Sequence, residues 1–473
     1  MKRFANGPTR PNWHELVRTQ GLVYVDTVLP SGETVSYWRE RQYYTLLESE
    51  TDLIGQANQA LWDAYIEGGE RMLAFERAWH GDPTHQERDC YFRKLAIPEW
   101  AIGAIMRTWQ LDEPDGSPCQ TVETEHYPCI YGRYDYSVER DSFGIITGVK
   151  LLEFNADTPT GLVESIIQWE WFESLHKTRG LDQWNSLYKD LIDRWVFELS
   201  EYRRKTGRLP FTVHLAYEVA EEEGEDYMTT VMMQQVVAKA ASAMGNGRTP
   251  AFDVKLIALG DIDRIPTGEI VASAPFTGTY VGGFADKDGV KIEMIFKLHP
   301  WEHMLQSRYG FGQTVMHNIL SDDPVIWVEA AYKLIWSNKG FLAVLWEFFK
   351  EDPRYAPYLL ETYFRNDSNT PEGFMRNCAV KPILSREGAN TTIFIDGIVA
   401  ASGPDCHYGD EGYVVQALAP LPVFEDPSEG PMHAVIGSWM VGDKGSGICI
   451  RESRGLITDN QSYFAPTYVE MGV

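Results

Sequence analysis

Two alternating segments joined by a polar turn restrict the fold of this chain more than any other feature. Polar and apolar side chains alternate over 129–137 and again over 148–155, and the turn between them lies near Gly144. Period-two alternation on both sides of such a turn predicts an antiparallel hairpin. Residues equidistant from the turn face each other in a hairpin, so we expect Asp135 to lie opposite Glu153.

One face of this hairpin is expected to carry chemistry. Side chains two residues apart on a strand share a face, which groups Arg133 with Asp135 and Glu153 with Asn155. Carboxylate and amide oxygens suit Mg²⁺, and the guanidinium would neutralise charge on a transferring phosphoryl group or a tetrahedral centre. The spacing is equally compatible with an exposed strand pair that carries an Arg–Asp ion pair.

A helix start follows the second strand directly. Thr158 suits the N-cap and Pro159 suits the first helical position. The free N–H groups of this helix end would face an anion held by the polar patch, which favours the functional interpretation.

A second group of candidate residues lies downstream. Lys339 precedes a predicted helix, and Lys381 ends an apolar strand before a loop in which Gly388 supplies the bend. A lysine and backbone N–H groups in this arrangement bind phosphates in many nucleotide sites, although a solvated lysine and an ordinary turn fit equally well. The strand over 413–418 suits either an adenine hinge or a plain core strand, and Arg451 suits either a cationic clamp or a surface ion pair.

The rest of the chain predicts a mixed α/β fold. The first hundred residues are mostly helical in pattern, and the last hundred return to short alternating strands. Between them, predicted strands over 211–217 and 253–258 flank a helix over 229–244, an order typical of parallel sheets.

Composition excludes several function classes. The chain has 42 Lys and Arg against 68 Asp and Glu, a formal charge of −26, which disfavours nucleic acid as a partner. An acidic surface suits a cationic substrate, but it also serves solubility alone.

No apolar run approaches the roughly 20 residues of a membrane span, and the first residues lack the apolar segment of a signal peptide. Six cysteines without a C-x-x-C pair are typical of reduced thiols, so we expect a cytoplasmic protein.

One motif suggests a different chemistry. His299 and His303 have the H-x-x-E-H spacing of some zinc proteases. Pro300 places His299 at a helix start, where its backbone is not helical, so a packed helix N-terminus is the favoured interpretation.

A set of motifs in fixed order extends over nearly the whole chain. These motifs are Arg133-Tyr-Asp135, Leu152-Glu-Phe-Asn-Ala-Asp-Thr-Pro-Thr160, Phe296-Lys-Leu-His-Pro-Trp-Glu302, Ser337-Asn-Lys339, Leu345-Trp-Glu347, Lys381-Pro-Ile-Leu-Ser-Arg-Glu-Gly-Ala-Asn390, Ile436-Gly-Ser-Trp439 and Gly447-Ile-Cys-Ile-Arg-Glu452. The set resembles the glutathionylspermidine synthase family, in particular its stand-alone synthetase branch of acid–amine ligases.

The resemblance implies an ATP-grasp fold, similar to glutathione synthetase and circularly permuted, because the metal carboxylates precede the lysines. It implies that ATP phosphorylates a carboxylate and that an amine, such as a polyamine, then attacks the acyl phosphate. The roles that it implies are Mg²⁺ ligation by Asp135, Glu153 and Asn155; stabilisation of the tetrahedral intermediate by Arg133; phosphate contacts by Lys339, Lys381 and Arg451; and the adenine hinge at Gln416 and Leu418.

The match to the family is looser at the substrates. Thr158 and Thr160 stand where bifunctional family members have serines. Glu221, Glu222 and Glu223 lie near the region where the family gathers acidic groups for the amine, although a solvated acidic loop is the favoured interpretation. Bifunctional members of the family carry an N-terminal cysteine amidase, and we expect none in this chain, which has no matching cysteine. We expect a helical region over 1–120, a metal-hairpin and substrate region over 121–330, and a nucleotide-binding lobe over 331–473. The alternative is an ATP-binding protein of the same fold without ligase activity.

Overall fold

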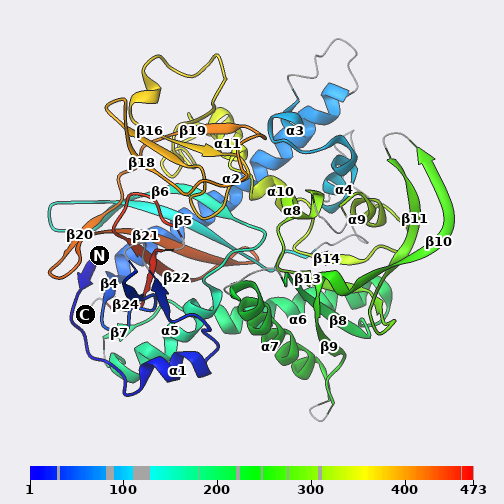
Figure 1. Cartoon of the computed structure of the whole chain (residues 1–473), viewed down its shortest axis with the longest axis horizontal. Coiled ribbons are helices and arrows are strands. Elements are labelled where there is room, and N and C mark those ends of the chain that lie inside the picture. Colours follow the sequence, from blue (N-terminus) through cyan, green and yellow to red (C-terminus); the bar gives the residue numbers. More distant parts are fainter. Residues whose placement is uncertain are drawn as a thin grey trace. The chain divides into compact units, whose positions relative to one another are not determined.

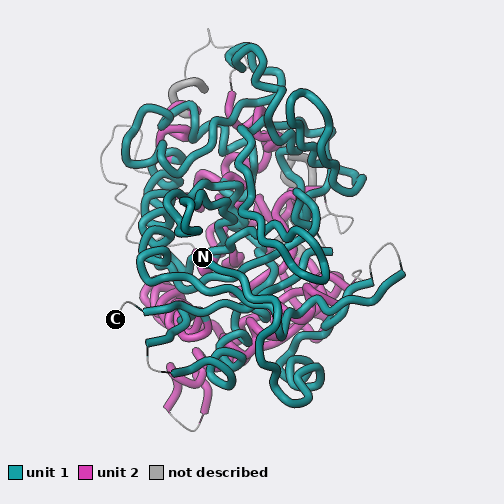
Figure 2. The backbone as a smooth tube through the Cα atoms, turned by 90° about the vertical axis from the view of Figure 1, so that its left-hand side faces the viewer, with its two compact units in different colours: residues 1–69, 132–187, 336–473 teal, residues 70–131, 188–335 magenta. Residues whose placement is uncertain are grey.

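The computed structural model describes residues 1–28, 32–80, 90–109, 128–178, 180–219, 224–246, 249–273, 276–306, 312–459 and 461–471. The chain divides into two compact units. Unit 1 comprises residues 1–69, 132–187 and 336–473, and unit 2 comprises 70–131 and 188–335 (Figure 2). The two units interleave along the chain, and the three consecutive segments expected from the sequence stay a prediction.

Unit 1 is rich in β-structure (Figure 1). Its helices are α1 (Trp13–Thr19), most of α2 (Glu48–His80), α5 (Leu162–Leu175), α11 (Gly340–Phe349) and the short η3 (Phe374–Arg376). Its strands are β1 (Lys2–Phe4), β2 (Asp26–Val28), β3 (Thr34–Ser36), β4 (Tyr43–Leu47), β5 (Tyr131–Arg140), β6 (Ile146–Asn155), β7 (Leu181–Asp182), β15 (Thr362–Phe364), β16 (Cys378–Pro382), β17 (Thr392–Ile395), β18 (Ile398–Ser402), β19 (Tyr413–Ala417), β20 (Val423–Asp426), β21 (Gly430–Val441), β22 (Lys444–Ser453), β23 (Tyr463–Ala465) and β24 (Thr467–Glu470).

Three sheets of more than two strands organise the described part of unit 1. The largest has the order β23-β22-β21-β5-β6, with β20 also paired to β21. The second, in the order β15-β19-β16-β17-β18, is antiparallel throughout, and the third joins β1, β4, β24 and β7. The predicted hairpin therefore forms one edge of a larger sheet, beside the long hairpin of β21 and β22 (Figure 1).

Unit 2 contains a parallel sheet. Its helices are α3 (Tyr91–Lys94), α4 (Glu99–Trp109), nearly all of α6 (Leu187–Thr206), α7 (Glu225–Met244), η2 (Leu259–Asp261), α8 (Trp301–Gln306), α9 (Gly312–Ile319) and most of α10 (Lys333–Trp336). Its strands are β8 (Thr212–Tyr217), β9 (Asp253–Ala258), β10 (Ile262–Ser273), β11 (Phe276–Asp286), β12 (Lys291–Ile292), β13 (Met294–Lys297) and β14 (Ile326–Val328). Strands β14, β13, β8 and β9 pair in parallel, and α7 connects β8 to β9, which confirms the strand–helix–strand prediction.

The hairpin has the predicted central pair, but two bulges produce it. Asp135 pairs with Glu153, as expected from a turn centred on Gly144. At the turn, however, Arg140 pairs with Ile146, and the register then shifts twice along β6. Each shift adds one unpaired residue to β6, first Thr147 and then Leu152. The facing carboxylates therefore depend on bulges that alternation alone does not predict.

Aromatic packing determines which face of the hairpin stays polar. The rings of Tyr134 and Phe154 stack with centroids 4.1 Å apart, and both contact Tyr65 of α2, with centroids 5.9 and 5.0 Å from it. Phe341 of α11 lies 5.4 Å from Tyr65. Burial of these large rings against α2 and α11 is strongly favourable, and strand alternation then directs the intervening polar side chains to the opposite face.

The helix after β6 begins later than the sequence predicts. The N-cap of α5 is Gly161, with φ of 80°, and not Thr158. This left-handed conformation is readily accessible to glycine, which explains the delayed start. The polar residues between β6 and α5 therefore form a loop beside the hairpin face.

None of the described helices combines the length and the apolar character that crossing a bilayer requires.

Candidate functional site

Two arginines hold one carboxylate of the hairpin. Arg133 donates from Nε and Nη2 to the two oxygens of Asp135, at 2.7 and 3.1 Å, and Arg451 of β22 donates from Nη2 to Oδ2 at 2.7 Å. Arg133 and Asp135 are only 3% and 2% exposed. Two cations around one buried carboxylate form a strong charge-assisted cluster.

The facing strand adds an amide and a second carboxylate. Asn155 Nδ2 lies 3.1 Å from Asp135 Oδ2 and 3.4 Å from Glu153 Oε1, so the three side chains converge as predicted. Glu153 Oε2 lies 3.0 Å from Lys339 Nζ at the start of α11. Lys339 also donates to the carbonyl of Ser385, which connects the hairpin to the loop after β16.

The second lysine contacts the hairpin backbone at a bulge. Lys381 Nζ donates to the carbonyl of Leu152 at 3.2 Å and to Oε1 of Gln416 at 2.7 Å. Because Leu152 is the unpaired residue of the bulge, its carbonyl is available to this lysine. The bulge in β6 thus provides a carbonyl acceptor for Lys381, one of the predicted site residues.

Burial and neighbouring charges control the protonation of these groups. Burial favours the neutral form of Glu153, but the ammonium groups of Lys339 and Lys381 outweigh burial and lower its pKa to about 2. Burial lowers the pKa of Lys381 to about 8, although the Glu153 carboxylate partly opposes the change. Burial also disfavours the charged form of Arg133, but Asp135 outweighs it and raises the arginine pKa. At neutral pH the site therefore holds the ionised carboxylate of Glu153 among cations.

The loops beside the hairpin contribute further contacts. Arg133 Nη1 donates to the carbonyl of Thr160, and Arg386 Nη1 donates to Oγ1 of Thr158 at 2.9 Å. Gly388 has φ of 69°, and a Cβ there would lie 2.5 Å from Cγ2 of Ile457. Only glycine fits this bend without displacing a neighbour.

The predicted hinge residues lie on and after β19. Gln416 is 1% exposed, accepts from Lys381, and leaves its buried Nε2 without a partner. The N–H of Leu418 donates to the carbonyl of Asn377 at 3.4 Å. Glu221, Glu222 and Glu223 lie outside the described residues.

Two residues missed by the sequence reasoning shape the position of Arg133. A Cβ on Gly437 of β21 would lie 2.9 Å from Cδ of Arg133, so the guanidinium arm crosses this strand where no side chain exists. The Trp439 ring centroid lies 5.6 Å from Cζ of Arg133, within range of a cation–π contact. Both belong to the Ile436–Trp439 motif. The glycine in this motif is the sequence feature that could have indicated a side chain crossing the strand.

A further missed residue is Glu164, in the first turn of α5. It is fully buried, and its Oε1 accepts from the hydroxyls of Tyr24 at 3.0 Å and Tyr37 at 2.7 Å, whereas Oε2 has no partner. Burial raises the pKa of this carboxyl. Nothing in the local sequence pattern distinguishes it from an ordinary acidic residue of a helix start.

The donor chemistry of the hairpin suits Mg²⁺ better than zinc. Asp135, Glu153 and Asn155 offer hard oxygens that converge on one face, and rotation of the Asn155 amide would present its oxygen to the same point. His299 and His303 have ring centroids 5.5 Å apart, and His299 precedes α8. Within the described ranges, no three or more His, Cys, Asp and Glu side chains are grouped to hold a metal ion, so the zinc alternative finds no support.

Comparison with known proteins gives consistent results. The family described as glutathionylspermidine synthase preATP-grasp matches residues 5–246 and 277–470. A Haemophilus influenzae protein with the provisional name acid–amine ligase is 26% identical over 479 residues, which cover 99% of each chain. Trypanothione synthetase of Crithidia fasciculata is 27% identical over 72% of this chain and 47% of its own length.

A solved structure shows the same fold. A glutathione synthetase-like effector of Globodera pallida superposes with a TM-score of 0.50 at 8% identity and covers 98% of both chains. The fold of this chain is thus the mixed α/β, glutathione synthetase-like ATP-grasp fold.

Proposed function

Because this chain belongs to the glutathionylspermidine synthase preATP-grasp family, we propose that it is an ATP- and Mg²⁺-dependent carboxylate–amine ligase. In the proposed reaction a substrate carboxylate attacks the γ-phosphorus of ATP, which gives an acyl phosphate and ADP. The amine nitrogen then attacks the acyl carbon, and phosphate and a proton leave as the amide forms. The names of the two relatives, a ligase and a synthetase, support this class of reaction.

The hairpin face would hold the metal through Asp135, Glu153 and Asn155. When bound, Mg²⁺ would neutralise charge on the phosphate oxygens of ATP. The residues of the chain perform the other tasks. Lys339 and Lys381 would attract the phosphates, since they are cations placed against the same carboxylate, Glu153.

The two arginines would act at the reacting carbon and phosphorus. Arg451 leaves a buried Nε without a partner, a donor available to an anion. Arg133 is held in place by Asp135 and Thr160, and this arrangement would preorganise its charge for the tetrahedral intermediate. Oxygens of a bound ligand could replace Asp135 and Thr160 as acceptors for these two guanidinium groups. The ligand would then receive the hydrogen bonds that those two residues receive in its absence.

A single observation carries the proposal: the ion pair of 3.0 Å between Glu153 and Lys339. The hairpin carboxylates and the two lysines are distant in the sequence, and this ion pair brings them together on one surface of unit 1. Carboxylates that precede the lysines in the chain also support a circularly permuted arrangement of the fold. The acidic composition supports an amine with several positive charges as one substrate.

An ADP-release screen over pairs of acids and amines tests the proposal. We expect turnover that requires both substrates and Mg²⁺, together with stabilisation of the fold by Mg·ATP in a thermal-shift measurement. Stabilisation by ATP without turnover on any pair would favour the alternative of an ATP-binding protein that has lost ligase activity. Failure of ATP to bind at all would contradict both.

A further inference from the structure

A chain of hydrogen bonds inside unit 1 connects Trp439 of β21 to the loop before α5. Nε1 of Trp439 donates to Oγ of Ser165 at 2.8 Å, and this hydroxyl donates to the carbonyl of Gly161 at 2.6 Å. Trp439 is fully buried and Ser165 is 1% exposed. We propose that Ser165 and Trp439 are positioning residues for Arg133. The proposal rests on the proposed function, in which the charge of Arg133 stabilises the tetrahedral intermediate.

The hydrogen-bond chain ends beside the acceptor of Arg133. Arg133 Nη1 donates to the carbonyl of Thr160, the residue before Gly161. This carbonyl and the Cα of Gly161 belong to one planar peptide unit, so a displacement of Gly161 also displaces the acceptor. A Cβ on Gly161 would lie 3.5 Å from Arg133 Nη1, which shows how closely the loop backbone passes the guanidinium. Because Ser165 holds Gly161, it also fixes the Thr160 carbonyl.

The ring of Trp439 lies on the same face of β21 that the arm of Arg133 crosses. Gly437 and Trp439 are two residues apart on this strand and therefore share a face. A Cβ on Gly437 would lie 2.9 Å from Arg133 Cδ, and the ring centroid of Trp439 lies 5.6 Å from Arg133 Cζ. The guanidinium is thus held by the indole ring and by the Thr160 carbonyl, and both depend on the same tryptophan.

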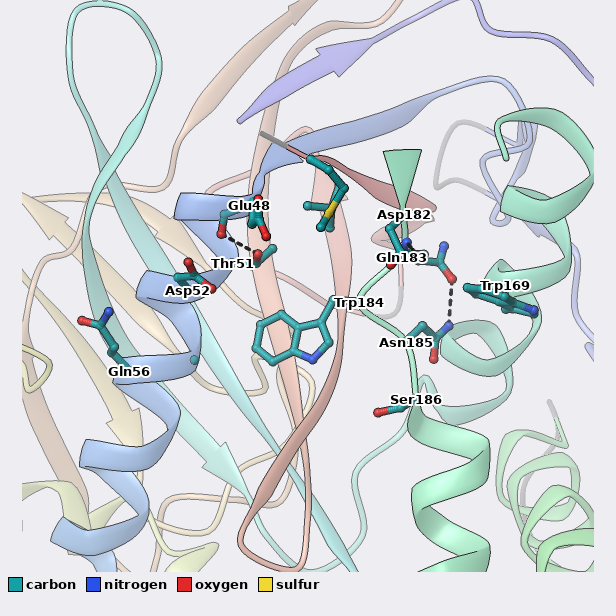
Figure 3. A pocket seen from close by; sticks show the side chains of 13 residues that line it. Glu48, Thr51, Asp52, Gln56, Trp169, Asp182, Gln183, Trp184, Asn185 and Ser186 are labelled. Carbon is teal, nitrogen blue, oxygen red and sulfur yellow. Dashed lines mark hydrogen bonds between the residues drawn. The ribbon is translucent and has the colours of Figure 1, made fainter. Parts of the chain in front are cut away.

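The backbone of Ser165 is held without its hydroxyl. Its N–H donates to the Gly161 carbonyl at 3.2 Å, and its own carbonyl accepts from Asn185 Nδ2 at 2.7 Å. Figure 3 shows that Asn185 also donates to Oε1 of Gln183, at 3.0 Å. Ser165→Ala should therefore remove the link to Trp439 and leave α5 in place. The buried indole N–H would then lack an acceptor, an unfavourable state that movement of the ring or the loop relieves.

Hydrogen exchange of the free protein tests whether the hydrogen-bond chain holds the loop, and it requires no catalysis. In Ser165→Ala the amides of residues 156–161 should exchange about threefold to tenfold faster, the factor expected for the loss of one neutral hydrogen bond. Ser200→Ala is the matched control, since it removes a serine hydroxyl that donates to the Val196 carbonyl at 2.7 Å within α6. Exchange over 156–161 should stay unchanged in this control.

Steady-state kinetics test whether the hydrogen-bond chain positions Arg133. Trp439→Phe keeps an aromatic ring but removes the N–H donor, and Ser165→Ala removes its acceptor. We expect each variant to lower kcat for amide formation by about threefold to tenfold with KM for ATP unchanged, because Arg133 acts in the transition state and both lysines are untouched. Both changes break the same chain, so the double variant should be no slower than the slower single variant.

Trp171→Phe is the matched control for the tryptophan. Its fully buried Nε1 donates to the Glu40 carbonyl at 3.0 Å, far from Arg133 in the network of contacts, and the variant should keep the parent kcat. An equal loss of kcat in Trp171→Phe, or losses that multiply in the double variant, would overturn the inference. Unchanged exchange in Ser165→Ala, or a raised KM for ATP in place of a lower kcat, would overturn it too.

Two further results separate this inference from the proposed function. If Trp439→Phe fails to fold, Ser165→Ala decides the question by exchange and by kcat. Absence of ADP release by the parent protein on every acid–amine pair would refute the proposed function instead. The exchange measurement would then still decide whether Ser165 and Trp439 hold the loop that binds Arg133.

Discussion

Glu153 of the β5–β6 hairpin lies 3.0 Å from Lys339, almost two hundred residues further along the chain, and this ion pair brings the two predicted groups of residues together. The contact explains why Glu153 stays ionised in spite of its burial. It also predicts that changes on either side of the pair will affect both metal and nucleotide binding.

Glu153→Gln should lower the rate of ADP release by about 100-fold, because the site loses one metal ligand and one charge. The substitution keeps the size of the side chain, so circular dichroism should show an unchanged fold. Glu139→Gln, an exposed change on the same hairpin, is the control and should keep full activity. Undiminished turnover in Glu153→Gln would refute its role.

The same variant has a predicted pH signature in stability. The folded-state pKa of Glu153, about 2, is below the ordinary value, so its carboxylate stabilises the fold above about pH 4. This contribution is lost as the pH falls towards 2. We expect the difference in unfolding free energy between parent and Glu153→Gln to shrink over that range in urea titrations, and a constant difference would contradict the cause assigned to the shift.

ATP affinity should fall above pH 8 because Lys381 loses its proton there. Above its pKa, binding that requires the ammonium form weakens by about tenfold for each pH unit. Calorimetry at pH 8.5 in two buffers of different ionisation enthalpy should detect proton uptake when ATP binds. Lys381→Arg keeps its charge and should show no such uptake, so uptake that persists in this variant would assign the proton to another group.

Asp135→Ala should reduce stability as well as activity. Removal of this carboxylate leaves the buried Arg133 without its bidentate partner, a change that costs about 3–5 kcal/mol for a buried pair. Chemical denaturation measures the loss of stability. Activity should be assayed well below the lowered melting temperature of the variant. A variant as stable as the parent protein would show that Arg133 finds another acceptor.

Gly437→Ala should displace Arg133 without altering any charge. The new Cβ would lie 2.5 Å from Cys449 Sγ and 2.9 Å from Arg133 Cδ, an overpacking that costs about 1–3 kcal/mol. We expect turnover to fall more than ATP affinity, because the lysines are untouched. Gly455→Ala, with its nearest neighbours 4.0 Å away, is the matched control.

Glu164→Gln should become relatively more stable as the pH rises. Burial raises the folded-state pKa of Glu164, so the parent protein loses stability between the ordinary pKa, about 4.3, and the raised value. Glutamine does not titrate. The melting temperature of the variant minus that of the parent should therefore increase from pH 4 to pH 7, and a difference independent of pH would contradict a raised pKa.

Much of the site followed from local patterns. Alternation predicted the hairpin and the shared faces of Arg133 with Asp135 and of Glu153 with Asn155. The expected turn at Gly144 predicted the pairing of Asp135 with Glu153, which the structure reaches through two bulges. The start of α11 after Lys339 was also predicted and is confirmed. These features depend on residues close in sequence, whose relative positions the strand and helix periods determine.

The sequence by itself determined the fold class, the polar face of the hairpin and the types of residue on it. Only the tertiary structure decided the two bulges in β6, the start of α5 at Gly161, and the contacts of Lys381 with Leu152 and Gln416. These features depend on side chains and backbones that meet after long stretches of chain have folded. Local periodicity does not predict these contacts, because it leaves several conformations equally accessible. Packing against α2, α11 and β21 then selects one of them.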